Sequence, residues 1–309
     1  MNIAFFGASS QIAKGLIKNF IRVETNKLYF FVRDKESFTD WLIDKKLNFD
    51  NSQIKSYDEF SKELYFDLLI NCIGAGDPQK TEDLSSSIIS ITEQYDLQVL
   101  RYLEFHSNTK YIFLSSGAAY GNIFSIPPET YDQQNLDINS NRSEDMYAIS
   151  KIMAERRHRD NPQYSIIDIR IFSYFDSEVN INNRFFLTDA LRSVYENKIF
   201  ITNRKNIIRD YIGANDLYQL ILQMTARSHL NTVVDTYSRA PIDKFSILEV
   251  LTKNFEFKYK FEDTDVGLNA TGNKEKYYSR NFCARKYGYT PTLSSEGIII
   301  SVATSILGS

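Results

Sequence analysis

Tyr147 and Lys151 are the residues whose types and spacing most directly predict chemistry, and they stand in the run Tyr-Ala-Ile-Ser-Lys. On a helix, residues four apart share a face, so a phenol and an ammonium would point the same way. A phenol has an ordinary pKa near 10, and we expect the adjacent ammonium to lower it. This spacing occurs once among the 20 tyrosines of the chain. It predicts Tyr147 as a proton donor or acceptor with Lys151 as its electrostatic partner.

A serine pair precedes this segment, at the end of an apolar run. Residues 113–121 read Phe-Leu-Ser-Ser-Gly-Ala-Ala-Tyr-Gly, typical of a strand that ends in a turn. The hydroxyl of Ser116 could bond the same substrate oxygen that Tyr147 protonates. Paired serines often serve only turn geometry, so this role depends on Tyr147 lying nearby.

A loop of small residues follows the first apolar run and opens a helical pattern. Residues 7–15 read Gly-Ala-Ser-Ser-Gln-Ile-Ala-Lys-Gly. Small residues allow backbone N–H groups to approach a pyrophosphate at a helix N-terminus. The residues expected to contact a dinucleotide here are Gly7, Ser9, Ser10, Gln11 and Ile12. Ser10 and Ala13 replace the usual glycines, so an ordinary strand-to-helix turn is the alternative.

Arg33 and Asp34 follow the second apolar run, 26 and 27 residues after Gly7. An arginine here suits a ribose 2′-phosphate, whereas an acid suits a free 2′-hydroxyl. Because Arg33 comes first, the pattern favours NADP(H) over NAD, while Asp34 leaves NAD open. A solvated charge pair at a strand end is the structural alternative.

Composition restricts the class of protein. The chain has 309 residues, 43% of them hydrophobic, and a formal net charge of −3, which does not suggest a nucleic-acid-binding protein. Two cysteines and three scattered histidines indicate neither a disulfide framework nor a metal site. The N-terminal residues lack a leader pattern, and the apolar run at 297–307 is too short to span a membrane, so we expect a cytoplasmic protein.

The elements that must position these residues alternate between short apolar runs and helical patterns. Strands are expected at 3–6, 28–32, 53–56, 66–73, 110–115 and 164–172, and helices at 11–22, 35–47, 81–106, 143–159 and 297–307. This order predicts an α/β fold, a doubly wound parallel Rossmann sheet with a smaller C-terminal α/β substrate-binding region. We place the dinucleotide-binding domain at 1–172 and the substrate-binding domain at 173–309, with an approximate, interleaved boundary.

Taken in order, these motifs resemble the extended short-chain dehydrogenase/reductases, and more narrowly the NAD(P)-dependent nucleotide-sugar epimerase/dehydratase family. Residues 208–217, Ile-Arg-Asp-Tyr-Ile-Gly-Ala-Asn-Asp-Leu, are similar to a family segment whose arginine holds a nucleotide diphosphate. Further similar segments lie at 67–74, 170–172, 182–183 and 286–291. The resemblance spans nearly the whole chain.

The resemblance implies roles for individual residues. Ser116, Tyr147 and Lys151 would be catalytic, and Lys151 would also hold the cofactor ribose. Arg209 and Asn183 would bind the nucleotide part of a nucleotide-sugar substrate. Further cofactor contacts are implied for Cys72, Ile73, Gly74 and Phe172. A homodimer through the helices at 81–106 and 143–159 is suggested by analogy alone.

Departures from the family pattern reduce the number of activities that we expect for this chain. The 4,6-dehydratases of the family carry an Asp-Glu pair after the catalytic hydroxyl, where this chain has Gly117 and Ala118. The leading hypothesis is therefore an NADPH-dependent reductase of a 4-keto nucleotide sugar. A nucleotide-sugar 4-epimerase is the alternative, and a non-catalytic dinucleotide-sensing protein is an alternative of another class. Asp96, Ser173 and Asp176 also replace usual family residues.

Overall fold

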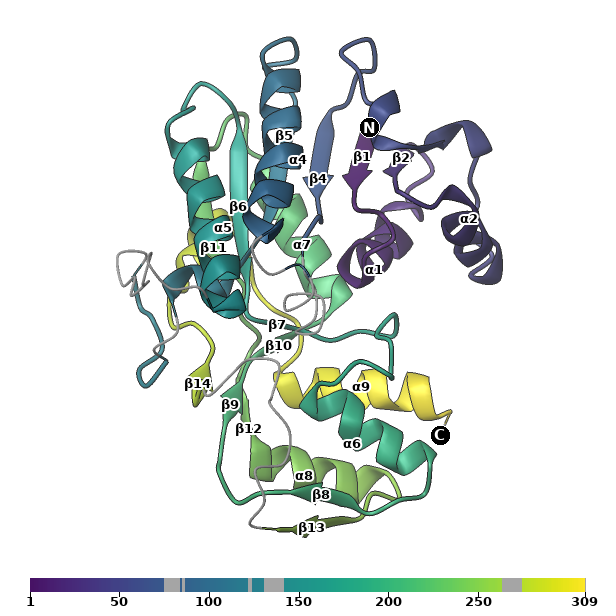
Figure 1. Ribbon diagram of the computed structural model, residues 1–309, viewed down its shortest axis with the longest axis vertical. Helices are drawn as coiled ribbons and strands as arrows, with labels where there is room; N and C mark the ends of the chain where they lie inside the picture. Colours follow the sequence, from purple (N-terminus) through teal and green to yellow (C-terminus); the bar gives the residue numbers. More distant parts are fainter. Residues whose placement is uncertain (75–83, 85–86, 122–123, 131–141, 263–273, 309) are drawn as a thin grey trace.

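A seven-stranded parallel sheet forms the centre of the computed structural model, which describes residues 1–74, 84, 87–121, 124–130, 142–262 and 274–308. The strand order is β11-β6-β5-β4-β1-β2-β3 (Figure 1). The strands are β1 (Asn2–Phe6), β2 (Lys27–Phe31), β3 (Ile54–Lys55), β4 (Leu68–Asn71), β5 (Lys110–Ser116), β6 (Ile166–Ile171) and β11 (Thr232–Asp235). This order and the parallel register confirm the predicted Rossmann sheet.

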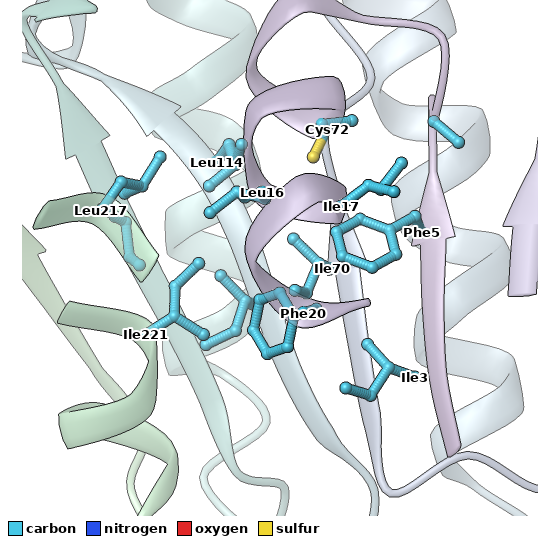
Figure 2. Close-up of a cluster of buried hydrophobic side chains, with 14 of the residues drawn as sticks. Ile3, Phe5, Leu16, Ile17, Phe20, Ile70, Cys72, Leu114, Leu217 and Ile221 are labelled. Carbon is cyan, nitrogen blue, oxygen red and sulfur yellow. The ribbon is translucent and has the colours of Figure 1, made fainter. Parts of the chain in front are cut away.

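Helices cover both faces of the sheet. One face carries α1 (Gln11–Phe20), α2 (Lys35–Asp44) and α7 (Ala214–Thr225), and the other carries α4 (Ser87–Leu103) and α5 (Ser143–Arg159). Alternate residues of a strand point to opposite faces, so Phe5 packs in the α1 layer and Phe6 in the α4 layer. Figure 2 shows the first layer, where Leu16 and Phe20 of α1 lie beside Leu217 and Ile221 of α7 over the sheet.

A smaller group of elements lies beyond the carboxyl ends of the sheet strands (Figure 1). Its helices α6 (Phe186–Tyr195), α8 (Lys244–Asn254) and α9 (Ser295–Leu307) share a hydrophobic core. Its short strands are β7 (Ser173–Tyr174), β8 (Phe200–Thr202), β9 (Ile208–Arg209), β10 (Tyr211–Ile212), β12 (Ile242–Asp243), β13 (Tyr259–Phe261) and β14 (Lys276–Tyr277). None of the helices in the described ranges is both long and apolar enough to cross a membrane.

The expected elements are present, with differences at their ends. The strand predicted at 66–73 is shorter in the structure, where β4 pairs with its neighbours from Leu68 to Asn71. The helix predicted at 81–106 is described from Ser87 to Leu103; residues 81–83 and 85–86 of that prediction lie outside the described residues. The terminal helix begins two residues early, capped by Ser294.

Asp96, one of the departures from the family pattern, belongs to an ionic network between the sheet and helices α4 and α5, in which His158, Asp96 and Asp168 are fully buried. The imidazole of His158 contacts Asp168 through Nδ1 at 2.6 Å and Asp96 through Nε2 at 2.7 Å. Arg157 and Arg159 donate to the outer oxygens of the same carboxylates. Two carboxylates on one ring require both ring nitrogens to donate, so His158 is an imidazolium.

This network predicts a loss of stability at alkaline pH. Burial alone would lower the pKa of His158, but Asp168 and Asp96 outweigh it and raise the pKa to about 9. A raised pKa stabilises the fold fully below the unfolded value near 6.5 and loses that contribution as pH passes through 9. We expect His158 to account for a fall of roughly 3 kcal/mol in the free energy of unfolding between pH 7 and 10, measured by denaturant melts as the difference between wild type and His158→Gln at each pH, since other buried groups titrate over the same range. The exposed control His229→Gln should follow wild type at every pH. A difference between wild type and His158→Gln that does not narrow by pH 10 would contradict the charged bridge.

Candidate active site

Lys151 lies on α5 with its side chain directed at the ends of β4 and β5. It is 2% exposed, and its Nζ donates to the carbonyl oxygen of Leu114 at 2.9 Å. The same nitrogen lies 4.6 Å from the ring centre of Phe113 and 5.7 Å from that of Tyr147. Burial lowers the pKa of Lys151 to about 8. The two predicted partners therefore share a face of α5, as their spacing indicates.

The protonation of Tyr147 differs from our expectation. Burial raises the pKa of the phenol, and a hydrogen bond with Ser116 lowers it only in part. The predicted net lowering of this pKa was wrong, because burial of the phenol has the larger effect, although the Lys151 ammonium lies over the same ring. At neutral pH Tyr147 is a protonated phenol, the form that can give up a proton.

Ser116 ends β5 and caps a short 3₁₀ helix, η3 (Gly117–Tyr120). Its Oγ accepts from the backbone N–H of Ala118 at 3.1 Å and lies 3.4 Å from the hydroxyl of Tyr277. The structure thus brings Ser116 and Tyr147 together, as predicted, and adds Tyr277. Sequence reasoning missed Tyr277, which is 161 residues from Ser116 and carries no local motif.

The packing around Gly117 leaves no room for an acidic side chain after Ser116. A Cβ at this position would lie 2.4 Å from the ring of Phe172. That ring is 6% exposed and packs against Tyr120, Phe124 and Tyr277. An acidic side chain in place of Gly117 would displace Phe172, a predicted cofactor contact, so the pocket is built without the acid of a dehydratase.

The loop between β1 and α1 has the shape that a dinucleotide requires. Gly7 has a φ of +70°, and a Cβ there would lie 3.1 Å from the backbone nitrogen of Ile73. Ser10 caps α1 by accepting from Ala13, and the first turn carries no acidic residue. The helix N-terminus therefore keeps the positive end of its dipole toward the loop, which fits a pyrophosphate. Gly7 also donates to the hydroxyl of Tyr57 at 3.1 Å, a contact that the sequence did not indicate.

The remaining predicted loop residues differ in their surroundings. Ser9 is exposed and Ile12 is half-buried. Gln11 donates through its side chain to Asp176 at 3.1 Å, and Asp176 also accepts from Tyr174 at 2.8 Å. Asp176, a departure from the family pattern, thus binds the side chain of the first residue of α1. The side-chain amide of Gln11 is therefore engaged within the protein.

The segment after β4 lies beside Lys151. A Cβ on Gly74 would lie 3.3 Å from the Lys151 ammonium. Cys72 and Ile73 precede Gly74 and lie against Gly7. A Cβ added to Gly7 would lie 3.1 Å from atoms of both residues. Burial raises the pKa of the Cys72 thiol, which leaves it an apolar wall rather than a nucleophile. These residues occupy the place at which a cofactor ribose would pass between the glycine loop and Lys151.

Arg33 and Asp34 have different environments. Asp34 caps α2, and its Oδ1 accepts from the backbone N–H of Ser37 at 3.0 Å. Arg33 is exposed, and its side chain makes no hydrogen bond or ion pair with the described residues. The guanidinium is therefore available at the end of β2, whereas the acid already serves the helix.

Arg209 and Asn183, the two residues predicted to bind the nucleotide, have different surroundings in the structure. Arg209 is 3% exposed, donates to the carbonyl oxygen of Ile208 at 2.8 Å, and lies 5.9 Å from the ring centre of Tyr277. It therefore borders the Ser116 cluster. Asn183 precedes α6, where its backbone carbonyl accepts from Thr188. Within the described residues, the Asn183 side chain makes no hydrogen bond to the cluster.

The described residues contain no group of three or more histidine, cysteine or acidic side chains that could hold a metal ion. The assembled features are a glycine loop at a helix start, a buried Ser-Tyr-Lys set, and the buried Arg209 beyond the sheet edge. Together they define a dinucleotide-dependent enzyme of the Rossmann class.

Comparison with known proteins gives the family. The sequence model of the NAD dependent epimerase/dehydratase family matches residues 3–236, so the chain belongs to this family and is an enzyme. A search of curated proteins finds no match.

Solved structures share the fold over the whole chain. UDP-N-acetylglucosamine 4-epimerase from Methanobrevibacter ruminantium M1, in complex with UDP-N-acetylmuramic acid, has a TM-score of 0.79 at 14% identity, covering 99% of this chain and 98% of that one. UDP-glucuronic acid 4-epimerase from Bacillus cereus, with UDP-glucuronic acid and NAD, has a TM-score of 0.75 at 14% identity, covering 100% of this chain and 99% of that one. Helicobacter pylori ADP-L-glycero-D-manno-heptose-6-epimerase has a TM-score of 0.78 at 16% identity, covering 100% of this chain and 96% of that one.

Proposed function

We propose that this enzyme is an NADPH-dependent reductase that converts a 4-keto nucleotide sugar into the corresponding alcohol. The observation that carries the proposal is the buried set of Ser116, Tyr147 and Lys151 at the carboxyl edge of the sheet, with the phenol in its protonated form. A protonated phenol beside a second hydroxyl is suited to deliver a proton to a carbonyl oxygen.

The chain's own residues account for positioning and proton transfer. Bound NADPH would supply the hydride to the keto carbon. The Ser116 hydroxyl donates a hydrogen bond to the keto oxygen and holds it against Tyr147. Tyr147 gives its proton to that oxygen as the oxygen gains charge. The Lys151 ammonium, over the same ring, stabilises the resulting phenolate and would also hold the cofactor ribose.

Arg33 supports the phosphorylated cofactor. Its exposed guanidinium can pair with a 2′-phosphate, while the cap formed by Asp34 reduces the case for an acid on a free 2′-hydroxyl. We expect Arg33→Ala to weaken NADPH binding by roughly tenfold or more and to leave NADH binding within about twofold. Fluorescence titration of both reduced cofactors measures this directly. Equal effects on both cofactors would contradict the assignment of Arg33 to the 2′-phosphate.

A 4-epimerase is the second candidate, favoured by two structural neighbours that are 4-epimerases and by the NAD bound in one of them. The two functions differ in net chemistry. Incubation with NADPH and 4-keto nucleotide sugars tests the first through loss of absorbance at the reduced nicotinamide. Incubation of 4-hydroxy nucleotide sugars without added cofactor tests the second through formation of the epimer. Epimer formation with no net NADPH oxidation would replace the reductase by the epimerase.

A further inference from the structure

Lys274 differs from the other buried cations of the described residues. Four of these cations donate to an oxygen of the protein; they are Lys151, Arg170, Arg209 and Lys244. Lys274 is 8% exposed, and no described oxygen accepts from it. Its Nζ lies instead over two aromatic rings, 4.8 Å from the centre of Tyr277 and 5.3 Å from that of Phe124.

Aromatic rings compensate only part of the cost of burying an ammonium. A desolvated cation–π contact contributes about 2 kcal/mol, whereas burying an unpaired ion costs several kcal/mol. Glu144 and Asp145 favour the charged form from a distance, but neither forms an ion pair with Lys274, and Asp145 pairs with Arg142. Burial lowers the pKa of Lys274 to about 8, so the side chain is still mainly charged at neutral pH. A buried charge without a partner among the residues that the structure describes fits an anion supplied by a ligand.

The position of Lys274 shows which part of a substrate it would meet. The Tyr277 ring under its ammonium carries the hydroxyl that lies 3.4 Å from Ser116. Phe124, the other ring, packs against Phe172 beside η3. Lys274 therefore borders the reacting centre. Arg209, on the same Tyr277 ring, is the cation that we assign to the diphosphate.

We propose that Lys274 binds a carboxylate on the sugar, which makes the substrate a nucleotide-linked sugar acid. This inference rests on the proposed function, because it assumes that the sugar lies against Ser116 and Tyr147. In a hexose the substituent on C5 lies next to C4, so a carboxylate there would be close to the reacting oxygen. An ammonium as a point charge suits a single carboxylate in a pocket walled by rings.

Binding of three uridine nucleotides to the full-length enzyme tests the proposal without requiring turnover. The probes are UDP-glucuronic acid, UDP-glucose and UDP; the two sugars differ only in a carboxylate against a hydroxymethyl group. Calorimetric titration should show that wild type prefers the sugar acid. Lys274→Met should weaken binding of UDP-glucuronic acid by about 30-fold and leave UDP-glucose and UDP within about twofold. Lys274→Arg should retain most of the preference, and the exposed control Lys258→Met should behave as wild type.

The outcomes separate this inference from the proposed function. Equal weakening of all three ligands by Lys274→Met would assign the lysine to the diphosphate and overturn the inference. Tight UDP binding by wild type with no preference for the sugar acid would overturn the inference and leave the nucleotide-sugar function standing. The probes carry UDP because two structural neighbours are bound to UDP-sugars. No binding of any of the three ligands would exclude a UDP-linked sugar acid and overturn the inference in this form. NADPH binding and the melting temperature of each variant verify that the fold is intact.

Discussion

Tyr147→Phe should lower kcat/KM for reduction of a 4-keto nucleotide sugar by about 10²–10⁴-fold, the range for loss of a positioned acid. The substitution removes one hydroxyl and keeps the ring under Lys151. Cofactor binding and the melting temperature should therefore stay close to wild type. Steady-state kinetics, NADPH titration and thermal melts of the same preparation measure the three quantities.

The matched control is Tyr195→Phe, which removes a hydroxyl from a side chain that is 77% exposed. It should retain full activity. Wild-type turnover in Tyr147→Phe would remove the phenol from the mechanism. A large fall in melting temperature would instead indicate that the hydrogen bond with Ser116 supports the fold.

Lys151→Met should reduce kcat/KM by about 10²-fold, because the phenolate loses its neighbouring positive charge. Stability should respond in the opposite direction. The ammonium is 2% exposed and bonds a single carbonyl oxygen, so its burial costs free energy that methionine does not require. We expect an unchanged or higher melting temperature together with weaker cofactor binding.

A lower kcat/KM together with an unchanged or higher melting temperature distinguishes a functional lysine from a structural one. If Lys151→Met melted well below wild type, the contact with Leu114 would be a stabilising one and the electrostatic role would lose its support. The exposed control Lys258→Met makes the same change in net charge and should alter neither quantity.

Local patterns were sufficient to predict the elements that carry the site. Short apolar strands and 3.6-residue periodicity identified the sheet and its helices, and the spacing of Tyr147 and Lys151 placed both on one face of α5. The small-residue loop identified the turn at Gly7, whose φ of +70° and close contact with Ile73 require glycine. Each of these features depends on residues close in sequence.

Contacts between distant segments could not be predicted in this way. Tyr277, on β14, reaches Ser116 from a segment that pairs with β9 beyond the sheet, and Lys274 lies over the ring of Tyr277. The departures at Asp96 and Asp176 appeared to concern the substrate pocket. The structure gives them other partners, the buried His158 and the Gln11 side chain. The pKa of Tyr147 was predicted in the wrong direction because burial, which depends on the whole fold, outweighs a neighbouring charge.

Transfer of deuterium tests the central claim most directly. The enzyme is incubated with NADPH that carries deuterium at both nicotinamide C4 positions and with a 4-keto nucleotide sugar, and the product is analysed by mass spectrometry and NMR. Our account predicts one deuterium at C4 of the sugar for each cofactor oxidised, with the label absent in Tyr147→Phe over the same time. A 4-hydroxy product without deuterium at C4, or cofactor oxidised without a labelled sugar, would contradict hydride transfer at this site.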